Sequence, residues 1–136
     1  PYRNLAIELL GKEGELEEVV RLVGIDAISE PEQLILLVTK IIREDFLYQS
    51  AFDPIDQYST FKKQFLMMKA IIFYYKEGGL LLQEGELLSD ISKFESIKKI
   101  GGLRFVREED IVKSVESLIG EMKLEINSLR GKRTNG

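Results

Sequence analysis

The chain has 136 residues, of which 44% are hydrophobic and 31% are charged, and its formal net charge is −4. It contains no cysteine and no histidine, which excludes disulfides and thiolate metal sites and removes the commonest general base. The negative net charge argues against a nucleic-acid-binding surface, and the longest apolar runs fall far short of the roughly 20 residues of a membrane span. The chain begins with Pro1 rather than Met, so we expect a fragment of a longer protein.

Apolar residues at helical spacing predict a first helix over residues 2–23. Gly11 and Gly14 lie inside it, and each costs about 1 kcal/mol relative to alanine, so we expect one kinked helix or two pieces. Gly24 is a typical left-handed residue at a helix end. The predicted inward face consists of Leu5, Leu9, Leu16, Val20 and Val23.

The second predicted helix has a clear beginning. Ser29 and Glu32 form the pattern of a capping box, and Pro31 stands in the first turn. The helix should end near residue 48 or 49. A connection over residues 49–58 follows, which is longer than a helical hairpin needs. The predicted inward face consists of Leu34, Val38, Ile41, Ile42 and Phe46.

The third helix is predicted to begin after a cap at Ser59 and to be apolar nearly all round, which indicates a buried, central helix. We expect residues 78–79, both glycine, to bend it and Gly85 to end it. One row of large apolar side chains is assigned to the core: Phe61, Phe65, Met68, Ile72 and Tyr75.

The C-terminal third predicts a shorter helix over residues 86–99, a turn at 101–102 and a brief extended stretch at 103–106. The last helix should run from about residue 108 to 129, with a disordered tail over residues 130–136. The inward residues of the two helices are Leu88, Ile91, Phe94 and Ile97 in the first, and Ile111, Val115, Leu118, Met122, Ile126 and Leu129 in the second.

These patterns predict an all-α fold, a single domain over residues 1–136 built as a helical bundle of about five helices with short connections. The sequence has no phosphate-binding glycine loop and no GxSxG elbow. Acidic pairs such as Glu44-Asp45 and Glu108-Glu109 are sequence neighbours, which point away from each other on a helix and do not converge on one substrate. We therefore expect no catalytic residue and no metal site in this chain.

Three stretches of the sequence resemble segments of a known protein family. Residues 43–52 read REDFLYQSAF and lead into Asp56-Gln57-Tyr58, residues 63–69 read KQFLMMK, and residues 15–24 read ELEEVVRLVG. They are similar to the REDFLQQNAF…DxY, KQxxMxK and LQEIVRLVG stretches in the C-terminal domain of the catalytic A subunit of A/V-type rotary ATPases. The resemblance covers residues 13–77 well and the remainder more loosely.

The resemblance implies a parent subunit that synthesises or hydrolyses ATP and couples this to proton or sodium-ion transport. ATP or ADP and Mg²⁺ would bind in an upstream P-loop domain, and this chain itself would hold no cofactor. Its partners would be the B subunit together with the central-stalk rotor subunit, without nucleic acid or direct membrane insertion. The implied location is cytoplasmic, peripheral to the membrane in the soluble head. Residues 1–12 fit the tail of an upstream linker helix.

The loop at residues 24–32 is similar in placement to the acidic DELSEED loop of the related F-type beta subunit. The resemblance implies contact with the rotor through Asp26, Ser29, Glu30 and Glu32. The loop holds fewer acids than that motif, so a steric push would suffice. In the alternative interpretation, these acids stabilise a helix N-terminus through its dipole; both interpretations can hold together.

The connection at residues 49–58 is the second site. The resemblance implies that Phe52 lies against the adenine ring, with Gln49 nearby and Tyr58 also lining the nucleotide. Stacking of a base on an aromatic ring is worth about 1–3 kcal/mol. In the alternative, Phe52 packs under its own loop. Tyr48 and Ser50 replace the family's first Gln and its Asn, which changes the polar contacts available to the nucleotide.

Two other classes of function are weighed against this one. The first is a freestanding helical adaptor that binds another protein through an exposed groove, and the second is a small enzyme that uses lysines and carboxylates. The coding sequence upstream of Pro1 separates them. A GxxxxGK[ST] motif some hundreds of residues earlier favours the ATPase, and a nearby start codon favours the adaptor.

Overall fold

The computed structural model describes residues 2–47 and 60–135, and within these ranges every regular element is a helix, as predicted for an all-α fold. The elements in chain order are α1 (Tyr2–Val23), the 3₁₀-helix η1 (Ile25–Ala27), α2 (Glu30–Ile41), the π-helix η2 (Ile42–Leu47), α4 (Thr60–Gln83), α5 (Leu88–Ile91), α6 (Glu95–Lys98), the 3₁₀-helices η4 (Ile100–Phe105) and η5 (Glu108–Asp110), and α7 (Ile111–Asn135).

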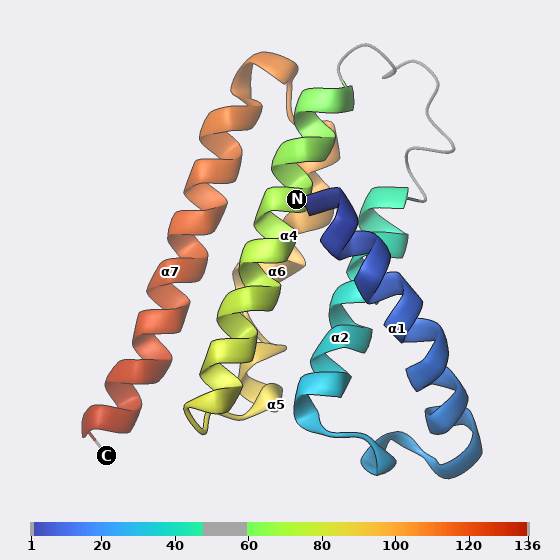
Figure 1. Ribbon diagram of the computed structural model, residues 1–136. Coiled ribbons are helices and arrows are strands. Elements are labelled where there is room, and N and C mark those ends of the chain that lie inside the picture. Colours follow the sequence, from blue (N-terminus) through green and yellow to red (C-terminus); the bar gives the residue numbers. More distant parts are fainter. Residues whose placement is uncertain (1, 48–59, 136) are drawn as a thin grey trace.

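Helix α4 is the centre of the bundle. It lies between α7 on one side and the antiparallel pair of α1 and α2 on the other (Figure 1). Helices α4 and α7 run in the same direction. The segment that connects them in the chain contains the short helices α5, α6 and η4 and returns behind α4. The turn between α1 and α2 and the corner between α4 and α5 therefore lie at the same end of the domain, together with the C-terminus of α7 (Figure 1).

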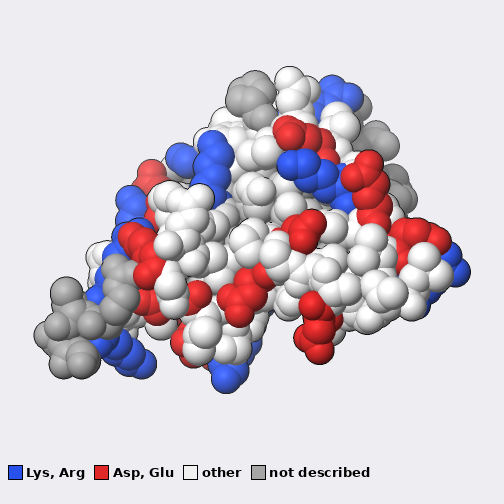
Figure 2. All heavy atoms as spheres, turned by 60° about the horizontal axis from the view of Figure 1, so that its bottom comes forward, with Lys and Arg blue, Asp and Glu red and all other residues white. Residues whose placement is uncertain are grey.

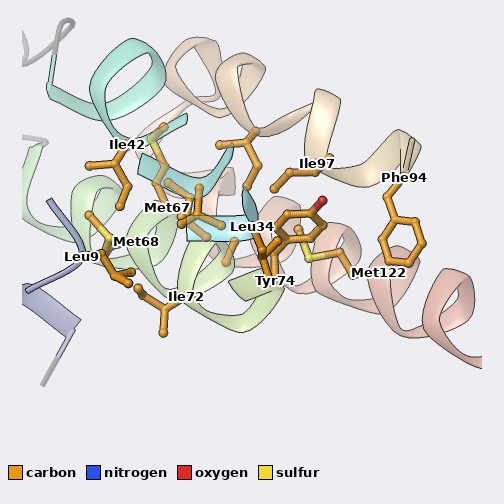
Figure 3. Packing of buried hydrophobic residues seen from close by; sticks show 14 of the residues in the cluster. Leu9, Leu34, Ile42, Met67, Met68, Ile72, Tyr74, Phe94, Ile97 and Met122 are labelled. Carbon is orange, nitrogen blue, oxygen red and sulfur yellow. The ribbon is translucent and has the colours of Figure 1, made fainter. Parts of the chain in front are cut away.

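The core forms around α4 because its sequence is apolar on nearly every side. Seven of its apolar side chains are buried: Met67, Met68, Ala70, Ile71, Ile72, Tyr74 and Leu81. Figure 3 shows side chains from both flanking sides converging on these residues. Burial of each large apolar side chain contributes about 1.5–3 kcal/mol, so α4 supplies much of the hydrophobic stabilisation.

Phe65 corrects the predicted core row of α4. Met68 and Ile72 are buried and Tyr75 is partly buried, but Phe65 is 55% exposed. Its ring instead packs on Tyr2 of α1, with ring centroids 5.3 Å apart. Phe61, the first member of the row, has a side chain outside the described residues. The neighbouring helices do not cover every side of α4, so the part of its apolar surface that carries Phe65 remains exposed to solvent.

Helix α1 is uninterrupted from Tyr2 to Val23, so Gly11 and Gly14 do not divide it. The predicted end is confirmed: Gly24 has a φ of 97°, a conformation that a glycine adopts without steric cost. Leu9 and Leu16 are buried as expected, whereas Val23 is 68% exposed and is not part of the inward face.

Gly78 of α4 acts through packing rather than by bending the helix. The helix continues through residues 78–79, and a Cβ added at Gly78 would lie 3.2 Å from Cδ2 of Leu34 in α2. A hydrogen atom at this position therefore lets α2 approach α4 closely. Gly85, with a φ of 96°, follows the end of the helix as predicted.

The segment between α4 and α7 differs from its prediction. The expected helix over residues 86–99 is two single turns, α5 and α6, because the Glu125 carboxylate of α7 accepts the backbone N–H groups of Glu95 and Ser96 at 2.7 and 3.2 Å and so fixes a new helix start. The expected extended stretch at 103–106 belongs mostly to the 3₁₀-helix η4. The inward residues Ile91, Phe94 and Ile97 are buried as predicted.

The C-terminal helix is longer than predicted. Its apolar stripe is buried from Ile111 to Ile126, but α7 continues to Asn135, where we expected a disordered tail. Arg130 explains part of this extension. Its guanidinium donates to Glu84 at 3.0 Å and lies 4.0 Å from Glu77, so the last turns are paired with the end of α4.

Candidate functional site

The turn that joins α1 to α2, which we call the tip (residues 24–32), has a fixed hydrogen-bonded structure. Ser29 is the N-cap of α2, and its backbone N–H donates to Oε1 of Glu32 at 2.9 Å. The Glu32 backbone N–H donates in return to the Ser29 hydroxyl at 3.3 Å, so the predicted capping box is present. The hydrogen bonds from the Ser29 backbone and hydroxyl lower the pKa of Glu32, which favours the charged form of the carboxylate.

Glu30 connects the tip to a second segment. Its Oε2 accepts the backbone N–H of Leu88 at 3.2 Å, at the beginning of α5. The amide of Gln33 donates to the carbonyl oxygens of Ile28 at 3.2 Å and Ile25 at 3.4 Å, and so holds η1 against the first turn of α2. Sequence reasoning missed Gln33 and Leu88, because neither lies in the acidic pattern that identified the loop.

Three of the four predicted tip residues therefore make hydrogen bonds within the domain, and the fourth, Asp26, lies exposed on η1. Apolar side chains share this end of the domain: Leu22 is 69% exposed, Val23 68% and Ile25 45%. Figure 2 views the domain from this end and shows acidic side chains separated by wide uncharged surface. The exposed surface of the tip is therefore partly apolar and partly acidic.

An ion pair fixes the segment that leads toward residues 49–58. Arg43, in the π-helix η2, donates from Nε at 3.0 Å and from Nη2 at 2.6 Å to Oε2 of Glu13 in α1, and Glu17 lies 3.5 Å from Nη2. The hydrogen bond to Glu13 raises the pKa of the Arg43 guanidinium. Glu13 is 7% exposed, so its buried carboxylate has a charged partner, as burial requires.

The sequence carried a weak signal for this pair. Glu13 stands at helical spacing between the buried Leu9 and Leu16, where an acid is unexpected unless it is paired. The partner Arg43 is thirty residues away and could not be assigned without the fold. The π-helix that contains Arg43 is a rare element that occurs frequently at functional sites.

The predicted nucleotide-lining residues, Gln49, Phe52 and Tyr58, lie outside the described residues, and their roles stay predictions. Within residues 2–47 and 60–135, no group of acidic side chains is arranged to hold a metal ion. No helix in these ranges is both long and apolar enough to cross a membrane. Burial raises the pKa of Tyr74, and its hydroxyl donates to the Ile91 carbonyl at 2.8 Å, so this buried phenol holds α5 to α4.

The fold and these contacts define a class: an all-helical domain whose polar residues mainly fix helix ends and join neighbouring helices. The chain belongs to the family described as the C-terminal domain of V and A type ATP synthase, whose model matches residues 1–92. The resemblance found in the sequence is thereby confirmed.

Curated relatives match nearly the whole chain. It is 42% identical over 132 residues to the A subunit of the A-type ATP synthase of Methanosarcina mazei, covering 97% of this chain and 22% of that relative. It is 40% identical over 131 residues to the V-type ATP synthase alpha chain of Clostridioides difficile, covering 96% of this chain and 22% of the relative. The alpha chain of Thermoanaerobacter pseudethanolicus is 43% identical over 109 residues. The chain thus spans about a fifth of the length of these relatives.

Proposed function

We propose that this domain is the moving lever of the catalytic A subunit of an A/V-type rotary ATPase. Nucleotide and Mg²⁺ bind in a preceding domain, where ATP is synthesised or hydrolysed. The helical domain shifts with the state of that site and pushes on the central stalk, which couples turnover to proton or sodium-ion transport. The similarity to proteins named as the A subunit or the alpha chain of ATP synthases supports this role.

The observation that carries the proposal is the way the tip is built. A lever transmits force only if its end does not yield under load. Glu30 joins the tip to α5, the Ser29–Glu32 capping box closes the first turn of α2, and Gln33 holds η1. Helix α2 packs on α4, and α1 packs mainly on α2, so the two helices that carry the tip are joined to the centre of the bundle through α2 (Figure 1).

The same contacts favour a steric push over a charge contact. The carboxylates of Glu30 and Glu32 are directed into hydrogen bonds of the domain itself, and the exposed neighbours Val23 and Ile25 are apolar. Partners follow from this role: the tip meets the central-stalk subunit, whereas the B subunit lies beside the catalytic A subunit. We infer from the family resemblance that ATP or ADP contacts Phe52, Gln49 and Tyr58.

Cross-linking in the assembled enzyme tests the proposal. The chain has no cysteine of its own, so Ile25→Cys places a single thiol at the tip and Leu124→Cys places a control thiol on α7. Paired with cysteines introduced along the central stalk, the tip thiol should form a disulfide that stops ATP turnover until reductant is added. If only the control thiol reaches the stalk, or if the tip disulfide leaves turnover unchanged, the lever role is wrong.

A further inference from the structure

Two aromatic rings from different helices lie together at the surface of the bundle. Phe65, in the second turn of α4, is 55% exposed. The ring of Tyr2, which is partly buried, lies beside it with the two centroids 5.3 Å apart and the planes tilted by 53°. Figure 1 shows the first turn of α1 beside the N-terminal half of α4. Met68, one turn further along α4, is buried, so the exposed pair stands on backbone that is fixed by the core.

Unpaired lysines flank Phe65 on α4. Lys62 stands three residues before it and Lys69 four residues after it, which is the spacing of side chains that share one helix face. Both lysines are exposed. Neither makes an ion pair within residues 2–47 and 60–135. The Phe65 ring therefore lies between two cationic side chains that have no anionic partner in the described part of the domain.

The acids of α1 and α4 do not balance these charges. The first acid of α4 is Glu77, and it lies 4.0 Å from Arg130 of α7. The first acid of α1 is Glu8, and it lies 3.7 Å from Lys12. The surface around the two rings is thus aromatic and cationic, in a chain whose net charge is −4. A complementary surface carries an apolar group and carboxylates.

The path of the polypeptide indicates which partner covers this surface. In the proposed function a further domain precedes this one in the same polypeptide, because the family is a C-terminal domain and the chain spans about a fifth of its relatives. A preceding domain is joined to this one through the first turn of α1, where Tyr2 already contacts Phe65. The covalent connection gives the preceding domain a high effective concentration at this surface, which no separate protein shares.

We propose that Tyr2, Lys62, Phe65 and Lys69, which we call the α4 patch, form a contact of this domain with the preceding domain of the same polypeptide. An apolar side chain of that domain covers the two rings, and one or more of its carboxylates face Lys62 and Lys69. Contacts between domains of one chain are commonly polar and modest in area, which agrees with an aromatic pair between two cations.

The proposal rests on the proposed function and adds to it the place where force enters the lever. Helix α2, which leads from the tip, packs on α4. A push of the preceding domain on the α4 patch would therefore act directly on the helix that supports the tip.

Photo-cross-linking in the full-length protein tests the α4 patch. Phe65→p-benzoylphenylalanine keeps an aromatic ring there, and Leu124→p-benzoylphenylalanine, on a side chain of α7 that is 72% exposed, is the control. The probe at position 65 should give a product that migrates as a single polypeptide and joins position 65 to a residue before Pro1, and the control should give none. Products only with another subunit, only with a second copy, or only within residues 1–136 would overturn the proposal, as would no product.

Charge reversal tests the expected carboxylate. Lys69→Glu, added to the position-65 probe, should lower the yield of this product at least about tenfold, whereas Lys69→Arg should retain it. Lys93→Glu, at an exposed position between α5 and α6, is the matched control and should leave the yield unchanged. The unfolding midpoint of each variant reports whether the fold is intact. Equal yields from Lys69→Glu and Lys69→Arg would overturn the carboxylate contact.

Lysine labelling of the unsubstituted full-length protein gives a measurement that does not depend on variants. An amine-reactive reagent should modify Lys69 at least about tenfold more slowly than Lys93, and equal rates would contradict coverage of the patch. A full-length protein that turns over ATP but never joins position 65 to its preceding domain would refute the patch alone. A full-length protein without a nucleotide-binding domain would instead refute the proposed function.

Discussion

The guanidinium of Arg43 lies 2.6 Å from the carboxylate of Glu13, thirty residues earlier in the chain. This contact joins the π-helix η2 to the middle of α1. It shows how a segment that leads toward the predicted nucleotide-lining residues is held by a helix that also forms one side of the tip. The ion pairs of Arg43 with Glu13 and Glu17 therefore link the position of η2 to that of α1.

Replacement of Glu13 by Gln should destabilise the fold by about 1–2 kcal/mol. The loss is smaller than the 3–5 kcal/mol typical of a fully buried pair because the Arg43 side chain is 49% exposed and partly hydrated. Glu18→Gln, which removes an exposed pair with Arg21, is the control and should change stability by less than about 0.5 kcal/mol. Urea unfolding followed by circular dichroism measures both, and equal losses would contradict a special role for Glu13.

The capping box should make the stability of the tip depend on pH. Hydrogen bonds from Ser29 lower the folded pKa of Glu32 below its ordinary value of 4.5. The stabilisation is therefore fully present above the unfolded pKa and is lost as the pH falls through the lower folded pKa. The difference in unfolding free energy between wild type and Glu32→Gln should be constant from pH 7 to about 5 and should shrink in more acidic solution.

Ser29→Ala removes the other half of the same box. It should cost about 0.5–2 kcal/mol at neutral pH, whereas Ser128→Ala, at an exposed position of α7, should have almost no effect. Thermal unfolding measures both variants. A Ser29→Ala protein as stable as wild type would show that the cap does not hold the tip.

Substitution by alanine should change the stability of the fold differently at two adjacent glycines of α4. A Cβ at Gly79 meets nothing within 4 Å, so Gly79→Ala should stabilise the helix by about 0.5–1 kcal/mol. A Cβ at Gly78 would lie 3.2 Å from Leu34, so steric crowding should offset that gain or exceed it. The difference between the two unfolding midpoints measures the close approach of α2 and α4, and equal midpoints would contradict it.

Phe52→Ala in the full-length protein should weaken nucleotide affinity by about 5- to 150-fold, the equivalent of the roughly 1–3 kcal/mol of a stacked base. Phe52→Tyr, which keeps the aromatic face, should retain most of the affinity. Titration with a fluorescent ATP analogue measures this. Wild-type affinity in the alanine variant would remove Phe52 from the nucleotide-lining residues.

Local patterns predicted the parts of the fold that depend on local physics. The capping box at Ser29 and the apolar stripe of α7 were read correctly, because each depends on neighbours within one or two helical turns. The exposure of Phe65 and the division of residues 86–99 into α5 and α6 were not predictable in this way. The exposure of Phe65 depends on which sides of α4 the neighbouring helices cover. The division into α5 and α6 depends on Glu125, which lies about thirty residues downstream of the helix start that it fixes.

The same distinction applies to the candidate site. Asp26, Glu30 and Glu32 could be identified as acids near a turn, but only the fold shows that Glu30 reaches Leu88, fifty-eight residues away. The small number of acids in the loop already made a steric push sufficient, and the three-dimensional contacts favour the same interpretation. The pair of Glu13 with Arg43 was missed because the position of Glu13 on the buried face of α1 is only a weak signal, and its partner thirty residues away is visible only in the fold.

Rotation torque of single assembled enzymes tests the lever role most directly. The triple variant Asp26→Asn, Glu30→Gln and Glu32→Gln removes the charge of the tip but keeps its shape, whereas deletion of Asp26 and Ala27 shortens it. A steric push predicts near-normal torque in the first and a clear loss in the second. Collapse of torque in the amide variant, or full torque from the shortened tip, would contradict it.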